Sequence, residues 1–168
     1  MIGGEEFEAL YEEHAQALFG FLAYRTGDRA VAEDLVAETF ERALRAWRRF
    51  DPRQANRKTW LYAIGLNCFR DHLRRAAVEG RVMEQSAVLE ESASSRGTVQ
   101  VEARDAVRRG MEVLSDEERE AIALRYGGDL TVPEIAKVTG EPLTTVEGRV
   151  YRALRKLREE IGEEIGVD

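Results

Sequence analysis

Large apolar residues recur at helical spacing along the first half of the chain. One apolar stripe covers residues 5–25, a second covers 31–50 and a third covers 58–75. A repeat of three to four residues places apolar side chains on one face of a helix. Gly27 ends the first stripe, and Asp28 is expected to cap the second helix. Three amphipathic helices of this kind can bury one shared core.

The last third of the chain carries three helix-start signals of one type. In each, a Ser or Thr precedes a Glu by three residues, as in a capping box. These pairs are Ser115 with Glu118, Thr131 with Glu134, and Thr144 with Glu147. Glycine-containing breaks separate the segments, so the pattern predicts helices over 116–126, 132–139 and 144–161. A short turn joins the last two, which is the shape of a helix-turn-helix.

The segment between these two parts has a different composition. Residues 80–98 are rich in serine and contain few large apolar side chains. Such a segment is typical of a linker. The sequence therefore predicts an all-α fold of two small helical domains, 1–78 and 108–168, joined by a linker over 79–107.

Charge is distributed unevenly along the chain. The 168 residues have a formal net charge of −7, yet residues 149–158 hold five basic groups and no acid, and 159–168 hold five acids and no base. On a helical wheel, Thr145, Arg152 and Lys156 lie beside Arg149. The apolar stripe lies on another side and consists of Val146, Val150, Leu154, Leu157 and Ile161. This basic face is suited to contacts with phosphates and base edges in duplex DNA.

A second basic segment has an aromatic component. Within 57–75, five cations alternate with aromatic and amide side chains; they are Arg57, Lys58, Arg70, Arg74 and Arg75, with Trp60, Tyr62, Asn67 and Phe69 between them. Cations with aromatic faces are typical of single-strand binding. Large aromatic residues are mostly buried, however, so Trp60 and Phe69 are expected in the core. The carboxylates of 33–41 form either a solvated face or a protein-docking face.

Composition limits the chemistry that the chain can perform. One cysteine, Cys68, allows no internal disulfide and is expected to be a buried thiol. Two histidines leave little material for a zinc site, and neither a Ser/His/Asp set nor a phosphate-binding glycine loop is present. No apolar stretch reaches membrane-spanning length, and the first residues lack a signal peptide. We therefore expect a cytoplasmic protein that is not an enzyme, has no cofactor or metal and does not insert into membranes.

Two stretches resemble a known family. Residues 32–52, AEDLVAETFERALRAWRRFDP, and 57–75, RKTWLYAIGLNCFRDHLRR, resemble region two of bacterial sigma factors. Residues 114–159, which include LTVPEIAKVTGEPLTTVEGRVYRALRKL, resemble sigma region four. Both regions in this order, with a variable linker, are similar to the small extracytoplasmic-function (ECF) sigma factors.

The resemblance implies a transcription initiation factor that binds core RNA polymerase and directs it to promoter DNA. Region two would dock on the polymerase and would recognise and help to melt the −10 element, and region four would bind the −35 duplex. By position, the polymerase-docking residues are Glu33, Asp34, Glu38 and Phe40. The −10 residues are Asn56, Lys58, Asn67, Arg70 and Arg74. The −35 residues are Thr144, Thr145, Arg149, Arg152 and Lys156.

The resemblance also implies a regulator and leaves some features open. Family members are commonly held inactive by an anti-sigma factor. Glu147 and Gly148 depart from the family's usual basic residue and serine, which bears on the −35 sequence preference. The two domains could be extended, or packed together so that their DNA-binding faces are hidden.

Three other functions remain alternatives at this point. The first is a helix-turn-helix transcriptional regulator that works without polymerase. The second is a helical interaction protein without DNA binding, and the third is an enzyme that uses the carboxylates of 33–41. Binding to core RNA polymerase distinguishes the sigma-factor interpretation from all three alternatives.

Overall fold

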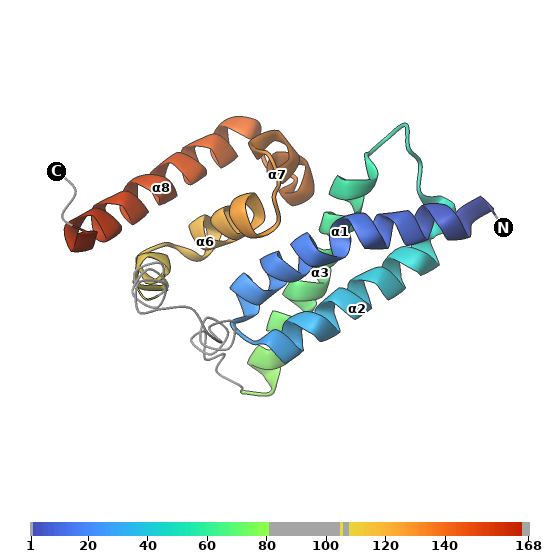
Figure 1. Cartoon of the computed structure of the whole chain (residues 1–168), viewed down its shortest axis with the longest axis horizontal. Coiled ribbons are helices and arrows are strands. Elements are labelled where there is room, and N and C mark those ends of the chain that lie inside the picture. Colours follow the sequence, from blue (N-terminus) through green and yellow to red (C-terminus); the bar gives the residue numbers. More distant parts are fainter. Residues whose placement is uncertain (1, 81–104, 106–107, 166–168) are drawn as a thin grey trace.

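Two groups of helices make up the structure, a computed structural model that describes residues 2–80, 105 and 108–165 (Figure 1). The N-terminal bundle contains α1 (Ile2–Thr26), α2 (Arg29–Ala46), the short 3-10 helix η1 (Trp47–Arg49) and α3 (Arg57–Val78). The C-terminal bundle contains α6 (Asp116–Ile122), the single π-turn η2 (Ala123–Gly127), α7 (Val132–Thr139) and α8 (Leu143–Ile165). All regular elements in this described part are helices, which confirms the all-α prediction. Most of the predicted linker, 79–107, lies outside the described residues.

The helices of the N-terminal bundle begin and end where the chain supplies suitable groups. Gly27 has φ +66°, a left-handed conformation that ends α1 at little cost. The Asp28 carboxylate then accepts hydrogen bonds from the backbone N–H groups of Ala30 and Val31, at 2.9 and 3.2 Å. This confirms Asp28 as the N-cap of α2. The side chain of Asn56 caps α3 in the same way.

Two of the three predicted capping boxes are present. Ser115 with Glu118 caps α6, and Thr131 with Glu134 caps α7. The third prediction is wrong, because α8 begins at Leu143 and Thr144 is already inside the helix. The N–H groups of Thr145 and Val146, the third and fourth residues of α8, donate to the carbonyl of Pro142 at 3.1 and 3.2 Å. Capping therefore does not explain the acidic Glu147, which is exposed near the start of this helix.

A dense apolar core joins α1, α2 and α3. The largest fully buried side chains there come from α1 and α3, and they are Leu18, Phe21, Leu22, Leu61, Tyr62, Leu66 and Phe69. A Cβ at Gly65 would lie 3.0 Å from Leu18 Cδ1, so the glycine permits this close approach of α3 to α1. Cys68 is also buried, as expected. The burial of Tyr62 and Phe69 removes both rings from the single-strand surface that the sequence suggested.

The C-terminal bundle is a helix-turn-helix with an incompletely covered apolar stripe. Gly140, at φ +71°, ends α7, and the short turn after it leads into α8. Val146 and Val150, in the first half of α8, are buried as the wheel predicted. Farther along, Leu154 is 36% exposed, and the next apolar residues of the stripe are only partly buried. The second half of α8 therefore presents apolar surface.

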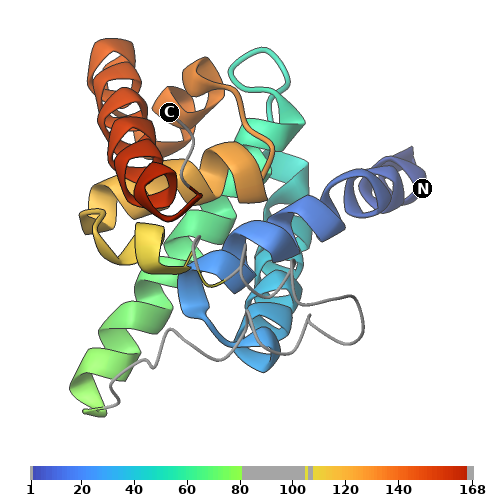
Figure 2. The ribbon, with the colours of Figure 1, turned by 60° about the vertical axis from the view of Figure 1, so that its left-hand side comes forward.

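The two bundles pack against each other and share one hydrophobic core. α1 contacts η2, and α3 contacts α7 (Figures 1 and 2). Of the two domain arrangements that the sequence left open, the structure has the packed one.

Candidate nucleic-acid interface

The acidic face of α2 has two kinds of carboxylate: exposed ones, and one that also pairs with a neighbouring helix. Glu33 and Asp34 are exposed, and Glu33 pairs with the neighbouring Arg29 at 3.4 Å. Glu38 is different, because it accepts from Arg42 at 2.5 Å and lies 3.5 Å from Arg75 on α3. Glu38 therefore joins α2 to α3 in addition to contributing negative charge. The exposed position on this face that is best suited to contact another protein is Asp34.

Phe40 lies beneath the surface of the same helix. Its side chain is 6% exposed, and its ring packs edge-on against Phe7 and Tyr11 of α1, with centroids 6.2 and 4.8 Å apart. The predicted polymerase-docking residue is thus a core residue in this conformation. It contributes to the surface by holding α2 against α1.

An aromatic cluster supports the loop at 51–56. Trp47 and Phe50 stack before the loop with centroids 5.8 Å apart, and Trp60 follows the loop and lies 4.9 Å from Phe50. The Arg57 guanidinium lies over the Trp47 ring at 5.6 Å. Trp60 is only half-buried, so it has a partly open face. This cluster was not predicted from the sequence, although the spacing of Trp47, Phe50 and Trp60 around a polar loop is a visible signal.

The five predicted −10 residues do not form one surface. Asn56 is committed to the helix cap, where its Oδ1 accepts from the Thr59 N–H at 2.8 Å. Asn67 and Arg74 are exposed on one face of α3, and Arg74 pairs with Asp71. These two residues share that face with Trp60 at helical spacing.

Lys58 and Arg70 face the C-terminal bundle. Lys58 Nζ donates to the carbonyl of Asp129 at 2.8 Å and lies 3.5 Å from Glu134. Arg70 lies 3.4 Å from Glu120. Burial tends to raise the pKa of Glu134, but hydrogen bonds from Thr131 and the charge of Lys58 outweigh it, so this pKa lies below its ordinary value. Two of the five cationic or amide candidates are therefore occupied by acceptors of the C-terminal bundle.

The predicted −35 surface is partly open. Thr144, Thr145 and Arg152 are exposed on the first turns of α8. The Arg152 guanidinium lies along the helix, 3.1 Å from where a Cβ of Gly148 would be. Arg152 therefore keeps its hydrogen-bond donors accessible, and Gly148 gives the guanidinium room to lie flat.

The other two −35 candidates are paired within the C-terminal bundle. Arg149 is bidentate to Glu141 at 2.6 and 2.7 Å, and its side chain is only 14% exposed. The hydrogen bond from Arg149 holds the pKa of Glu141 below its ordinary value, and Glu141 raises the pKa of Arg149. Lys156 pairs with Glu118 at 2.9 Å and so joins α8 to the capping box of α6. Each of these pairs must loosen before the cation can contact a phosphate.

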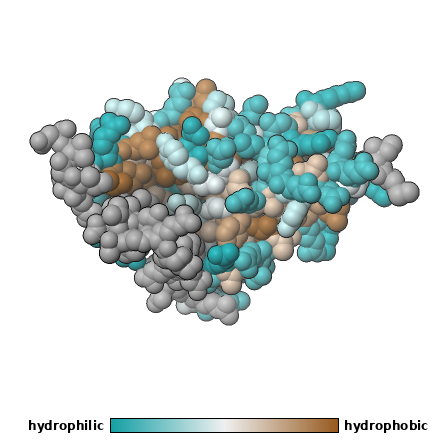
Figure 3. Space-filling model, in the orientation of Figure 1, coloured by the Kyte–Doolittle hydropathy of each residue, from teal (hydrophilic) through white to brown (hydrophobic). Residues whose placement is uncertain are grey.

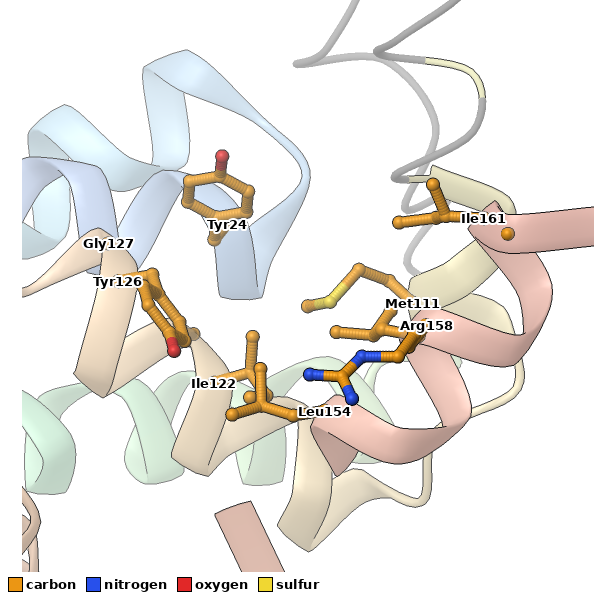
Figure 4. A pocket seen from close by; sticks show the side chains of 11 residues that line it. Tyr24, Met111, Ile122, Tyr126, Gly127, Leu154, Arg158 and Ile161 are labelled. Carbon is orange, nitrogen blue, oxygen red and sulfur yellow. The ribbon is translucent and has the colours of Figure 1, made fainter. Parts of the chain in front are cut away.

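An apolar groove of about 620 Å³ lies between the bundles (Figure 4). Tyr24 of α1 and Tyr126 of η2 line one side, and Leu154, Arg158 and Ile161 of α8 line the other. Figure 3 shows hydrophobic surface on the side of the molecule where α6 and α8 lie. Of the described lining residues, Tyr24 alone belongs to the N-terminal bundle, so most of the groove is a surface of the C-terminal bundle that α1 borders on one side.

The described ranges, 2–80, 105 and 108–165, contain neither a cluster of metal ligands nor a membrane-spanning helix. No group of three or more His, Cys, Asp or Glu side chains gathers there in a way that could hold a metal ion. None of the helices in these ranges combines the length and the apolar composition that crossing a membrane requires.

Family models match both parts of the chain. Residues 10–78 match sigma-70 region 2, and residues 104–157 match sigma-70 region 4. The first match covers the acidic face of α2, the aromatic cluster and α3. The second covers the helix-turn-helix.

Curated proteins from several bacteria are similar over nearly the whole chain. The ECF RNA polymerase sigma factor SigL of Mycobacterium tuberculosis is 32% identical over 164 residues, which cover 95% of this chain and 90% of SigL. The sigma factor CarQ of Myxococcus xanthus is 30% identical, with 95% and 91% covered. The ECF sigma factor BldN of Streptomyces coelicolor is also 30% identical, but this chain spans only 59% of its length.

Solved structures agree with this assignment. CnrH, solved in complex with the cytosolic domain of CnrY, aligns with a TM-score of 0.66 and 28% identity over 92% of this chain and 86% of CnrH. The sigma factor RpoE of Bartonella quintana shares the fold, with a TM-score of 0.71, 23% identity and coverage of 94% and 97%. The chain is therefore a member of the ECF RNA polymerase sigma factors, which are transcription initiation factors of the sigma-70 family.

Proposed function

We propose that this chain docks on core RNA polymerase through the exposed acidic face of α2 and directs it to promoters with two DNA-binding surfaces. The −35 duplex contacts the first turns of α8, and the melted −10 strand contacts α3 and the loop at 51–56. The observation that carries the proposal is the pairing of a region-two bundle with an exposed, basic helix-turn-helix in one chain. The chemistry of RNA synthesis belongs to the polymerase, so the protein acts in the cytoplasm as a non-enzymatic factor.

The proposal divides the chain into three parts. Residues 1–78 provide polymerase docking and −10 recognition, and residues 108–168 provide −35 recognition. The intervening 79–107 would connect the two along the polymerase. A fluorescence-anisotropy titration with sigma-free core RNA polymerase tests the whole proposal. Saturable binding that a known sigma factor competes away is expected, and a well-folded protein that does not bind would contradict it.

Arg74 gives a direct test of the −10 surface. Arg74→Ala removes one exposed cation from the face of α3 that also carries Asn67 and Trp60, so we expect a several-fold loss of affinity for single-stranded −10 DNA. Arg45→Ala on α2 is the matched control. Both side chains are 75% exposed, and each pairs with a carboxylate on its own helix, three or four residues earlier. Equal losses in both variants would mean that the effect is general charge and not a −10 contact.

We also infer a protein regulator for this chain. The relative CnrH was solved in complex with the cytosolic domain of CnrY, and an anti-sigma factor is the kind of partner that the family resemblance implies. The groove between Tyr24, Tyr126 and Leu154 offers such a partner apolar surface from both bundles at once. An apolar helix seated there would keep the two bundles together, and Arg158 at the rim would favour an acidic residue beside that helix.

A further inference from the structure

The loop at 127–130 packs closely against the backbone of α1. A Cβ added at Gly20 of α1 would lie 2.8 Å from the carbonyl oxygen of Gly127. A Cβ added at Gly127 would lie 3.3 Å from both the Gly20 oxygen and Phe21 Cα. The two backbones are therefore in direct contact, which a side chain at position 20 would prevent and a side chain at position 127 would strain.

The same loop is bonded to α3. A Cβ at Gly128 would lie 2.9 Å from a ring carbon of Tyr62, and the Tyr62 hydroxyl donates to the Gly128 carbonyl at 2.9 Å. Tyr62 is fully buried, and burial raises its pKa, so the hydroxyl stays protonated and keeps this bond. Leu130, at the end of the loop, is also fully buried. The loop thus contributes apolar packing and a buried hydrogen bond to the contact between the bundles.

Charged contacts surround this apolar centre. The carbonyl of Asp129 accepts from Lys58, Glu134 lies beside the same ammonium, and Glu120 pairs with Arg70. Asp129 itself has φ +55°, a left-handed conformation that Asp tolerates better than most residues. Each of these acceptors occupies a cation that a DNA phosphate would otherwise contact.

We propose that the Gly127–Leu130 loop is an internal latch, which holds the free protein in a closed form with Lys58 and Arg70 masked from DNA. This inference rests on the proposed function of those two residues in −10 binding. Exposed ion pairs contribute little by themselves, so the glycine contact and the Tyr62 hydrogen bond hold the bundles together. Glu134 and Glu120 compete with DNA in the closed form, because Lys58 and Arg70 give up their pairing with the C-terminal bundle when they contact phosphates instead.

Gly20→Ala is the decisive variant. The added methyl group would overlap the Gly127 carbonyl, but alanine favours the α1 helix more than glycine does, so the N-terminal bundle should stay folded. Gly4→Ala is the matched control, because it adds the same methyl group to the same helix where nothing lies within 4 Å. Tyr62→Phe is a second variant, which keeps the ring and removes only the hydroxyl that reaches the latch.

The measurements are the radius of gyration by small-angle scattering and the affinity for a short fluorescent single-stranded oligonucleotide of mixed sequence. We expect Gly20→Ala to be larger than the wild type and to bind the oligonucleotide about tenfold more tightly, because the masked fraction no longer reduces the apparent affinity. Tyr62→Phe should shift both values in the same direction by less, and Gly4→Ala should match the wild type.

Two results would overturn the latch. One is an unchanged radius of gyration in folded Gly20→Ala and Tyr62→Phe. The other is an expanded Gly20→Ala whose oligonucleotide affinity equals that of the wild type, since masking would then be absent. Core polymerase binding is measured in parallel. If neither the wild type nor Gly20→Ala binds polymerase, the proposed function fails, while the scattering comparison still decides whether the loop closes the molecule.

Discussion

Asp34→Arg is expected to lower the affinity for core RNA polymerase by about 100-fold, because it places a positive charge where the proposed interface needs a negative one. Asp34 is exposed on α2 beside Glu33 and Glu38. A like-charge contact across an interface costs several kcal/mol, whereas a surface substitution rarely changes stability by more than about 0.5 kcal/mol. The variant should therefore keep its circular dichroism spectrum and its Tm while losing polymerase in an anisotropy titration.

The choice of Asp34 over Glu38 follows from the structure. Glu38 contacts Arg42 and Arg75, so an arginine at this position would gather three cations between α2 and α3 and could unfold the bundle. A lost interaction would then have two explanations. Glu12→Arg, which reverses one exposed carboxylate on α1, is the control for overall charge. If Asp34→Arg and Glu12→Arg bind polymerase equally well, the docking face lies elsewhere.

Arg152→Ala is expected to weaken binding to the −35 duplex by about 10-fold to 100-fold, the loss that follows when one good base or phosphate contact is removed. Because Arg152 is exposed, the Tm of the variant should equal that of the wild type. Arg149→Ala should weaken duplex binding as well, but it should also lower stability by about 1 kcal/mol, because it breaks the bidentate pair with Glu141.

Comparing Arg152→Ala with Arg149→Ala separates a side chain that contacts DNA from one that also stabilises the C-terminal bundle. Arg155→Ala is the control on the same helix, since this side chain is 63% exposed and lies 3.9 Å from Glu159 of the same helix. Duplex affinity is measured at several salt concentrations, and polymerase binding is measured alongside. Removing a phosphate contact lowers the slope of log affinity against log salt by about one. If Arg155→Ala loses more duplex affinity than Arg152→Ala, the recognition face of α8 has been assigned wrongly.

Several −35 residues of α8 stay accessible to DNA in the closed molecule. Thr144, Thr145 and Arg152 remain exposed, while Lys58 is partly buried and Arg70 is paired with Glu120. The closed form therefore engages part of the −10 surface and leaves much of the −35 surface accessible. Duplex binding should consequently respond less than single-strand binding to Gly20→Ala.

The local structure of this protein could be predicted because its signals are local. Helical spacing of apolar residues located α1, α2 and α3, and the chemistry of caps located Asp28 and the two capping boxes that begin α6 and α7. The prediction failed where the local sequence fits two different helix starts equally well. Thr144 with Glu147 matches a capping box as well as the other two pairs do, but Pro142 moves the start of α8 upstream to Leu143. The basic face of α8 was predicted, but the pairing of Arg149 with Glu141 was not.

The sequence by itself determined the all-α class, the two helical parts and the family, because these depend on periodicity, capping residues and motif order. Only the tertiary structure decided that the two parts pack together. The Gly127–Gly128 pair reads along the chain as a helix end, and nothing local indicates that these glycines lie against Gly20 and Tyr62. Contacts between residues more than sixty positions apart depend on how whole helices pack. For that reason the tertiary structure, and not the sequence pattern, separates the masked Lys58 from the exposed Arg74 on the same helix.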